Sequence, residues 1–352
     1  MRVGRLSDKN VEKDVKTILN AKNEDELLDT LKKAHEARLR FFGRKICFYA
    51  PSFMYYRTGD YCSSPTAFST ISVTGKSCSL RCKHCGGKVL ETMHSAVTPE
   101  RLFQLCTQLK REGALGCLIS GGCLPDGTVP LAKFVDTINR IKKELGLTVF
   151  VHTGITDRET AESLKRAGVD GALIDVIGSD STIKEIYNLN VSVRDYENSL
   201  KTLSGAGITF VPHIIVGLHY GKLQGEVNAL KIASEYNPSA LVVIAFMPIH
   251  STEMQDVKPP EPLDVAKIVA AARVMFPRTP LTLGCMRPKG KHRARTDVLA
   301  VKAGVNGIAF PSEAAARFAK QQGYEVVYSP FCCAEAYVDS KLEPIFAVEH
   351  RL

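Results

Sequence analysis

Short apolar runs recur along most of the chain and alternate with amphipathic stretches of helical length. Eight such runs, rich in Val and Ile, span residues 70–74, 117–120, 149–152, 172–176, 210–216, 241–247, 281–285 and 305–310. Several follow a glycine that ends a helix, with an apolar residue opening the next strand. Eight strand–helix units over about 250 residues predict a (β/α)8 TIM-type α/β barrel, and an open parallel sheet is the alternative.

The two ends of the chain carry different patterns. Residues 1–44 are predicted to be helical, because apolar positions follow a 3.6-residue period up to Gly43. Residues 45–69 are aromatic and are predicted to be irregular, so 1–69 forms an N-terminal extension to a barrel over 70–323. Residues 324–330 are β-like, and a tail over 324–352 is predicted to return to the barrel mouth.

The composition excludes several classes of protein. The chain is 45% hydrophobic and 24% charged, which is typical of globular proteins. No run of 18 apolar residues and no apolar leader segment is present, so we expect a cytoplasmic protein without a membrane span. The net charge of +9 and the basic stretch 287–295 suit an acidic partner. No aromatic residues interleave with that stretch, so no nucleic-acid partner is expected.

Eleven cysteines are the strongest compositional signal, and three of them form a CxxxCxxC motif. Thiols stay reduced in the cytoplasm, where cysteine clusters more often serve metal binding or catalysis than disulfides. Cys78, Cys82 and Cys85 can hold three irons of a 4Fe–4S cluster and leave the fourth iron open. A closed zinc site would need His84 as a fourth ligand, but adjacent His and Cys residues coordinate one ion poorly.

CxxxCxxC directly after the first barrel strand resembles the radical S-adenosylmethionine (SAM) superfamily. The resemblance implies that Cys78, Cys82 and Cys85 are the catalytic cluster ligands and that SAM binds the open iron. SAM cleavage would then yield a 5′-deoxyadenosyl radical, which abstracts hydrogen from unactivated carbon. An electron donor such as ferredoxin is implied as well.

The resemblance extends to biotin-synthase-like members over residues 70 to about 325. Gly121 and Gly122 match a Gly-Gly-Glu segment that binds the methionyl amine, although Cys123 replaces the Glu. Arg194 lies in a segment similar to one whose Arg pairs with the SAM carboxylate. The implied cofactor-binding residues are His84, Gly121, Gly122, His152, Asp175, Arg194, Val216 and Gly217.

Two of these implied roles rest on short segments of the chain. Val216 and Gly217 lie in a strand-five segment whose counterpart packs against adenine. Asp175 and Asp180 stand where the subgroup places polar residues near the ribose, but either carboxylate could instead cap a helix.

The remaining cysteines suggest a second centre. Cys106 and Cys117 are expected to be packing residues. Candidate ligands for an auxiliary 4Fe–4S cluster at the barrel mouth are Cys62, Cys123, Cys285, Cys332 and Cys333. The alternative is that Cys332 and Cys333 are ordinary buried thiols. Arg287 matches a strand-seven arginine that ligates a second cluster in biotin synthase, but Cys285 stands two residues before it, which argues against biotin synthesis.

Two clusters favour sulfur insertion, because one can generate a radical and the other can donate sulfide. The combination resembles the archaeal-type, two-component lipoyl synthases. That resemblance implies an octanoyl chain on a lysine of a lipoyl domain or glycine-cleavage H protein, and a second homologous radical SAM subunit. The alternatives are another biotin-synthase-like radical SAM enzyme, performing methylation, rearrangement or carbon–carbon chemistry, and a non-catalytic iron–sulfur scaffold.

Overall fold

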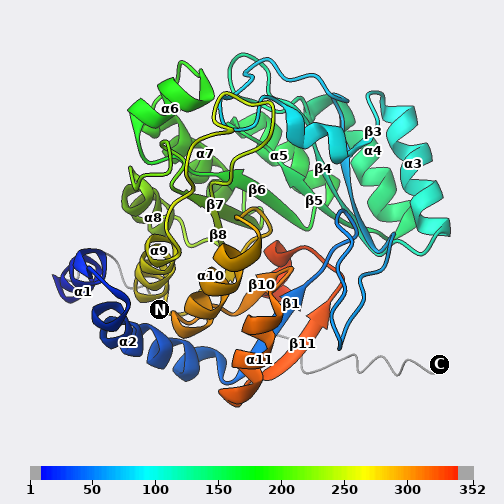
Figure 1. Cartoon of the computed structure of the whole chain (residues 1–352). Helices are drawn as coiled ribbons and strands as arrows, with labels where there is room; N and C mark the ends of the chain where they lie inside the picture. Colours follow the sequence, from blue (N-terminus) through cyan, green and yellow to red (C-terminus); the bar gives the residue numbers. More distant parts are fainter. Residues whose placement is uncertain (1–8, 340–352) are drawn as a thin grey trace.

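The computed structural model describes residues 9–339 and contains one curled sheet of parallel strands (Figure 1). The strand order within it is β11-β1-β10-β9-β8-β7-β6-β5-β4-β2-β3. The strands are β1 Lys45–Tyr49, β2 Phe68–Ser72, β3 His94–Ser95, β4 Gly116–Ser120, β5 Thr148–His152, β6 Gly171–Asp175, β7 Phe210–Val216, β8 Leu241–Ala245, β9 Leu281–Leu283, β10 Gly307–Ala309 and β11 Glu325–Ser329.

Helices cover the outer face of this sheet (Figure 1). They are α1 Lys9–Asn20, α2 Glu24–Phe42, α3 Pro99–Arg111, α4 Val135–Arg140, α5 Arg158–Ala167, α6 Asp180–Tyr187, α7 Val193–Gly205, α8 Glu226–Ser234, α9 Pro262–Met275, α10 Gly290–Lys302 and α11 Glu313–Gln321. The short helix α12 Ala336–Asp339 lies on the inner side of the sheet instead. None of the described helices is long and apolar enough to cross a membrane.

The predicted barrel-type α/β class is confirmed. All eight predicted strands are present as β2 and β4 to β10, in chain order and parallel. The ring does not close between β10 and β2, because β10 pairs with β1 instead, and β11 then adds outside β1. The strands at the two ends of the sheet order are therefore β11 and β3.

The prediction that residues 45–69 are irregular is wrong for 45–49, which form β1. Its partners are β10 and β11, which lie near the other end of the chain. Ile46, Phe48 and Tyr49 are residue types that favour strands, but the strands that pair with them are distant in the sequence. Both predicted extensions therefore contribute a strand to the sheet.

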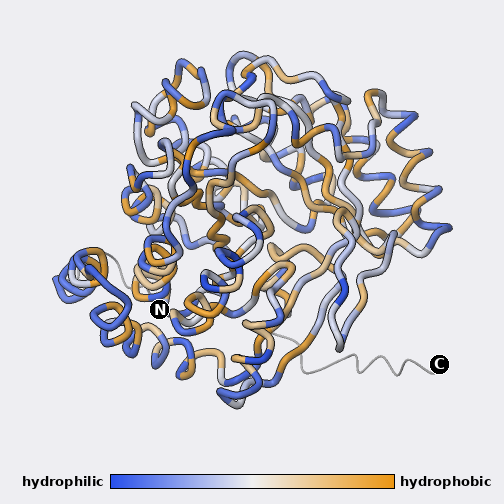
Figure 2. Tube along the Cα trace, in the orientation of Figure 1, coloured by the Kyte–Doolittle hydropathy of each residue, from blue (hydrophilic) through white to orange (hydrophobic). Residues whose placement is uncertain are grey.

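The strands bury both faces, so the molecule has two hydrophobic cores. Residues such as Ile71, Ile119 and Ile174 point outward and pack against the helices. The side chains that alternate with them along the strands, including Phe68 and Phe150, point into the barrel and form a separate inner core. Alternation along a strand sends neighbouring side chains to opposite faces. Both faces are covered, and several strands are therefore mostly hydrophobic along their length (Figure 2).

Residues 331–337 of the C-terminal tail pack inside the barrel. Cys333 and Ala334 are buried in the inner core, and the Phe331 ring packs edge-on against Phe68. The Tyr337 hydroxyl donates to the Asp170 carbonyl at 2.7 Å, just before β6 begins. The predicted return of the tail thus extends into the barrel rather than stopping at its mouth. Residues 340–352 of the predicted tail lie outside the described part of the chain.

Candidate active site

The CxxxCxxC loop follows β2 at the carboxyl end of the sheet, where chemistry sits in this class of fold. Its turn is tight, since the Gly86 amide donates to the Cys82 carbonyl at 2.7 Å. The Lys83 amide donates to the Ile186 carbonyl at 2.8 Å, and the Asn188 side-chain amide donates to the Leu80 carbonyl at 3.4 Å. The end of α6 therefore holds the loop in place.

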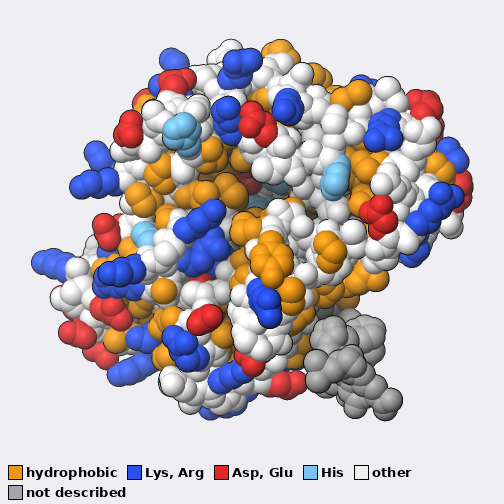
Figure 3. Space-filling model, turned by 45° about the vertical axis from the view of Figure 1, so that its right-hand side comes forward, with side chains coloured by type: hydrophobic (Ala, Val, Ile, Leu, Met, Phe, Trp, Pro, Cys, Tyr) orange, Lys and Arg blue, Asp and Glu red, His pale blue; other side chains and the backbone are white. Residues whose placement is uncertain are grey.

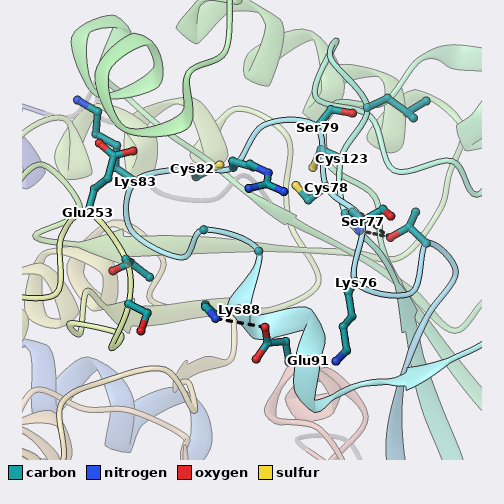
Figure 4. A pocket seen from close by; sticks show the side chains of 18 residues that line it. Lys76, Ser77, Cys78, Ser79, Cys82, Lys83, Lys88, Glu91, Cys123 and Glu253 are labelled. Atoms are coloured by element: carbon teal, nitrogen blue, oxygen red, sulfur yellow. Dashed lines mark hydrogen bonds and ion pairs between the residues drawn. The ribbon is translucent and has the colours of Figure 1, made fainter.

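The side chains of this loop bring several soft donors together. The Sγ atoms of Cys82 and Cys85 and a ring nitrogen of His84 all lie within 4.8 Å of one another. Cys78 and Cys123 lie across the same space (Figure 4). These residues border a cavity of about 750 Å³, whose wall includes Cys78, Cys82 and Cys123.

The donor set fits a cluster with thiolate ligands. A hydrogen bond with Cys82 lowers the pKa of Cys85. Burial acts in the opposite direction, and His84 adds to the lowering. The thiolate form of Cys85 is therefore favoured. Within the described residues, the buried Nδ1 of His84 has no hydrogen-bond partner. Three cysteines on one loop with a cavity beside them fit a 4Fe–4S cluster with an open iron.

Gly121 and Gly122, which follow β4, let the backbone of the CxxxCxxC loop pack closely against them. A Cβ atom at Gly122 would lie 2.0 Å from the Ser77 carbonyl oxygen and 2.6 Å from the Cys78 Cα atom. The Gly122 amide donates to the Thr74 hydroxyl at 2.7 Å. At Gly121 the added Cβ would meet the side chains of Thr74 at 3.1 Å and Val73 at 3.3 Å. No side chain therefore fits between Gly122 and Cys78, the first cysteine of the motif.

A second group of polar side chains lines the inner wall beside this loop. His152, Asp175 and His213 come from β5, β6 and β7, and one ligand atom from each lies within 4.8 Å of the other two. The His152 Nε2 atom is 3.5 Å from the Asp175 Oδ1 atom. The sequence analysis missed His213, although its place two residues after the inward Val211 marks it as a polar residue facing inward.

The charges in this group are coupled. Burial alone would lower the pKa of His152, but the Asp175 carboxylate outweighs it and the pKa is raised. Burial would raise the pKa of Asp175, but His152 and then His213 hold it below its usual value. Burial lowers the pKa of His213 to about 4. Asp175 therefore favours the charged form of His152, whereas His213 is a neutral imidazole near pH 7.

Arg194 lies apart from these groups. It is exposed in the first turn of α7 and does not line the cavity beside the cysteines. Asp180 accepts a hydrogen bond from the Val193 amide at 2.7 Å, so its carboxylate caps α7, as the alternative in the sequence analysis allowed.

Val216 and Gly217 end β7 in a tightly packed corner. The Gly217 amide donates to the Glu226 carboxylate at 2.8 Å. A Cβ atom at Gly217 would lie 2.6 Å from Pro260, and the residue has a positive φ of 72°. The backbone here is fixed by its neighbours, and both residues are buried.

The candidate auxiliary ligands separate into two sets. Cys285, Cys332 and Cys333 all pack in or against the inner core. Cys123 belongs with the CxxxCxxC loop, since its carbonyl accepts from the Ser79 amide at 2.8 Å. Cys62 is exposed. The structure thus narrows the five candidates to three that share the barrel interior.

Those three thiols influence one another electrostatically. Burial raises the pKa of Cys285 to about 11, and Cys332 adds to this shift. A hydrogen bond from Cys333 lowers the pKa of Cys332 against burial.

Cys106 and Cys117, predicted to be packing residues, are fully buried in the outer core.

Arg287 stabilises the barrel wall through buried polar contacts. Its guanidinium is buried and contacts Asp297 Oδ1 at 2.7 Å and Oδ2 at 3.1 Å. It also donates to the carbonyls of Gly284 at 2.6 Å, Ala309 at 2.8 Å and Phe310 at 3.2 Å. Its donors are thus engaged within the protein. Arg287 therefore contributes no exposed charge to the basic stretch 287–295.

Comparison with known proteins agrees with this arrangement. Residues 72–223 match the family model described as the radical SAM superfamily. The 3-methylornithine synthase of Methanosarcina acetivorans is 22% identical over 265 residues, covering 75% of this chain and 70% of that protein. The biotin synthase of Prochlorococcus marinus is 26% identical over 253 residues, covering 68% and 73%.

Solved structures share the fold. The crystal structure of methylornithine synthase (PylB) superposes with a TM-score of 0.63 at 18% identity, covering 92% of this chain and 97% of that one. The FeFe-hydrogenase maturase HydG from Carboxydothermus hydrogenoformans gives a TM-score of 0.64 at 16% identity, covering 94% and 78%. The radical SAM family uses a 4Fe–4S cluster and SAM, and the cysteine loop found here lies in the matched region. Residues 72–223 of this chain are therefore a radical SAM domain, and the chain has biotin-synthase-like homologues.

Proposed function

We propose that this enzyme inserts sulfur into an unactivated carbon chain, and that its product is the lipoyl group. The observation that carries the proposal is the second cysteine group. Cys285 follows β9 and Cys332–Cys333 follow β11, yet all three meet at the inner core of one barrel. The CxxxCxxC loop stands at the carboxyl end of the same sheet. Two sulfur-rich groups at one substrate space suit a reaction that needs both a radical and a sulfur donor.

Cys78, Cys82 and Cys85 hold the first cluster in this proposal, with Cys123 beside them. When cluster and SAM are bound, they supply the 5′-deoxyadenosyl radical that removes a hydrogen atom from substrate carbon. The chain's own part is to hold the loop on α6, to space it with Gly122 and to shield the site with the inner core.

Cys285, Cys332 and Cys333 are the proposed ligands of the auxiliary cluster. A cluster bound there would supply sulfide to the carbon radical, and its iron would accept the remaining electron. Each new carbon–sulfur bond then replaces one carbon–hydrogen bond and consumes one SAM. Dense packing by the tail around these thiols keeps water from a reactive intermediate.

The proposed substrate is an octanoyl chain on a lysine of a lipoyl domain or glycine-cleavage H protein. Lys76, Lys83 and Lys88 border the cavity beside the cysteine loop. Basic side chains also lie along part of the rim of the hollow in the face shown in Figure 3, among acidic and uncharged ones. A basic entrance favours an acidic carrier domain. A second homologous radical SAM subunit and a ferredoxin-type electron donor complete the proposal.

A carbon-skeleton rearrangement is the second candidate function. It is favoured by the similarity to a protein named 3-methylornithine synthase, which spans 75% of this chain. The two functions differ in whether they require the cysteines of the tail, because a rearrangement needs no sulfur donor. Cys332 and Cys333 would then be packing residues that can be replaced.

Anaerobic turnover of an octanoyl-lysine peptide with SAM and a reductant tests the proposal. We expect a product heavier by sulfur from the wild-type enzyme, and loss of that product in Cys285→Ala and Cys332→Ala with SAM cleavage retained. Cys62→Ala is the matched control, because this thiol is exposed. SAM cleavage without sulfur transfer, unchanged by Cys332→Ala, contradicts sulfur insertion and favours rearrangement.

A further inference from the structure

We propose that His152, Asp175 and His213 form a binding site for a single divalent first-row transition-metal ion inside the barrel. The three side chains project from the neighbouring strands β5, β6 and β7. This site is separate from both cysteine groups and does not depend on which reaction the enzyme performs.

The spacing of the ligand atoms suits one ion. Two ligands bound to a tetrahedral ion at about 2.05 Å lie about 3.3 Å apart. The observed distance from His152 Nε2 to Asp175 Oδ1 is 3.5 Å. A charge-assisted hydrogen bond would instead be about 2.7–2.9 Å long. Small side-chain movements bring all three donors into coordination, since they already lie within 4.8 Å of one another.

The orientation of His213 is fixed by its own strand. Its Nδ1 atom lies 3.2 Å from the Val211 carbonyl oxygen. A carbonyl oxygen can only accept a hydrogen bond, so Nδ1 carries the proton and Nε2 has a free lone pair. Histidine ligands in metal sites are commonly held in this way by a carbonyl or carboxylate behind the ring.

The ligand types select the class of ion. Two imidazoles and one carboxylate suit Zn²⁺ or Fe²⁺, whereas Mg²⁺ and Ca²⁺ prefer sites made of oxygen atoms alone. Three protein ligands also leave at least one coordination position open. That position can take an anionic oxygen or sulfur donor, such as a carboxylate or thiolate of a bound substrate.

The site stands between the two cysteine groups. Asp175 interacts electrostatically with His84 and Cys123, which belong to the first group. His152 interacts in the same way with Cys332, which belongs to the second. An ion held here therefore adjoins the space that a substrate occupies in a reaction involving either group.

Cobalt titration tests this inference under anaerobic conditions, in a full-length variant that lacks the thiols of both cysteine groups. In this variant alanine replaces Cys78, Cys82, Cys85, Cys285, Cys332 and Cys333. We expect one Co²⁺ per chain, with visible bands of a nitrogen- and oxygen-ligated ion and no thiolate charge-transfer band. His213→Ala should weaken binding by at least about 100-fold, as removal of a direct ligand does more than the 10–100-fold loss from an outer partner. His250→Ala is the control, because this side chain is exposed.

Asp175→Asn keeps the shape of the side chain and covers the case in which His213→Ala does not fold, as judged by circular dichroism. Equal Co²⁺ affinity in folded Asp175→Asn and the parent variant overturns the inference. A spectrum dominated by thiolate charge transfer overturns it as well, since cysteines would then be the ligands. The sulfur-insertion proposal can fail without changing any of these results, because the titration involves neither SAM nor a cluster.

Discussion

Replacing Gly122 by alanine should displace the cysteine loop without touching any cysteine. The added Cβ atom would lie 2.0 Å from the Ser77 carbonyl oxygen and 2.6 Å from the Cys78 Cα atom. Non-bonded heavy atoms rest at about 3.5–4.0 Å. The loop backbone must therefore move by more than about 1 Å, and overpacking of this kind costs about 1–3 kcal/mol.

The consequence for function should exceed the consequence for stability. A shift of Cys78 by more than about 1 Å removes it from the geometry that it shares with Cys82 and Cys85, and iron–thiolate bonds tolerate little change in length. We expect Gly122→Ala to lower SAM cleavage at least tenfold after anaerobic reconstitution. Its free energy of unfolding, measured with the cluster absent, should fall by only about 1–3 kcal/mol.

Two other glycines provide matched controls. Gly205→Ala should behave as wild type, because an added Cβ atom there has nothing within 4 Å. Gly121→Ala should be intermediate, since its nearest contact is the Thr74 side chain at 3.1 Å. Wild-type SAM cleavage and cluster content in Gly122→Ala would refute the reasoning, because the loop would then tolerate a side chain beneath Cys78.

Three further predictions concern stability. Asp297→Asn should lower the free energy of unfolding by about 3–5 kcal/mol in denaturant titrations, because it leaves the buried Arg287 charge without its 2.7 Å partner. Burial raises the pKa of Glu226, so wild-type stability should fall as pH rises from 4.5 through the folded-state pKa, and Glu226→Gln should flatten that dependence. Tyr337→Phe should cost about 1 kcal/mol in the same titrations, because it removes the 2.7 Å bond to Asp170.

Each of these has an exposed counterpart as a control. Asp29→Asn breaks only a surface ion pair, and Tyr55 is 74% exposed, so Asp29→Asn and Tyr55→Phe should leave the free energy of unfolding essentially unchanged. Glu235→Gln should leave the pH dependence of unfolding unchanged, since this residue is exposed. If the substitutions at Asp297, Glu226 and Tyr337 changed the free energy of unfolding or its pH dependence no more than the controls do, these buried contacts would contribute little to stability.

Local patterns were sufficient to predict the repeated unit of the fold. Each strand from β2 to β10, apart from the two-residue β3, coincides with a run of apolar residues, because both faces of the sheet are buried. The CxxxCxxC motif could also be placed at a strand end, since its three cysteines lie close together in the sequence. These features depend on residues that are near one another along the chain.

Other features depend on contacts between distant segments. The pairing of β1 with β10 and β11 joins the two ends of the chain, and no local pattern encodes it. Arg287 lies in a basic run, but the buried Asp297 carboxylate decides its role. His213 gains significance only from His152 and Asp175 on the next strands. Long-range contacts therefore determined most of what the sequence analysis missed in the site.

The central claim is that two iron–sulfur clusters share one barrel, and acid-labile sulfide tests it most directly. Sulfide should be counted in the anaerobically reconstituted protein and in the Cys78→Ala, Cys82→Ala, Cys85→Ala variant, because a mononuclear ion adds none. The account predicts about eight sulfides per chain in the wild type and about four in the variant. About four in the wild type and none in the variant would contradict it, leaving a radical SAM enzyme without an internal sulfur donor.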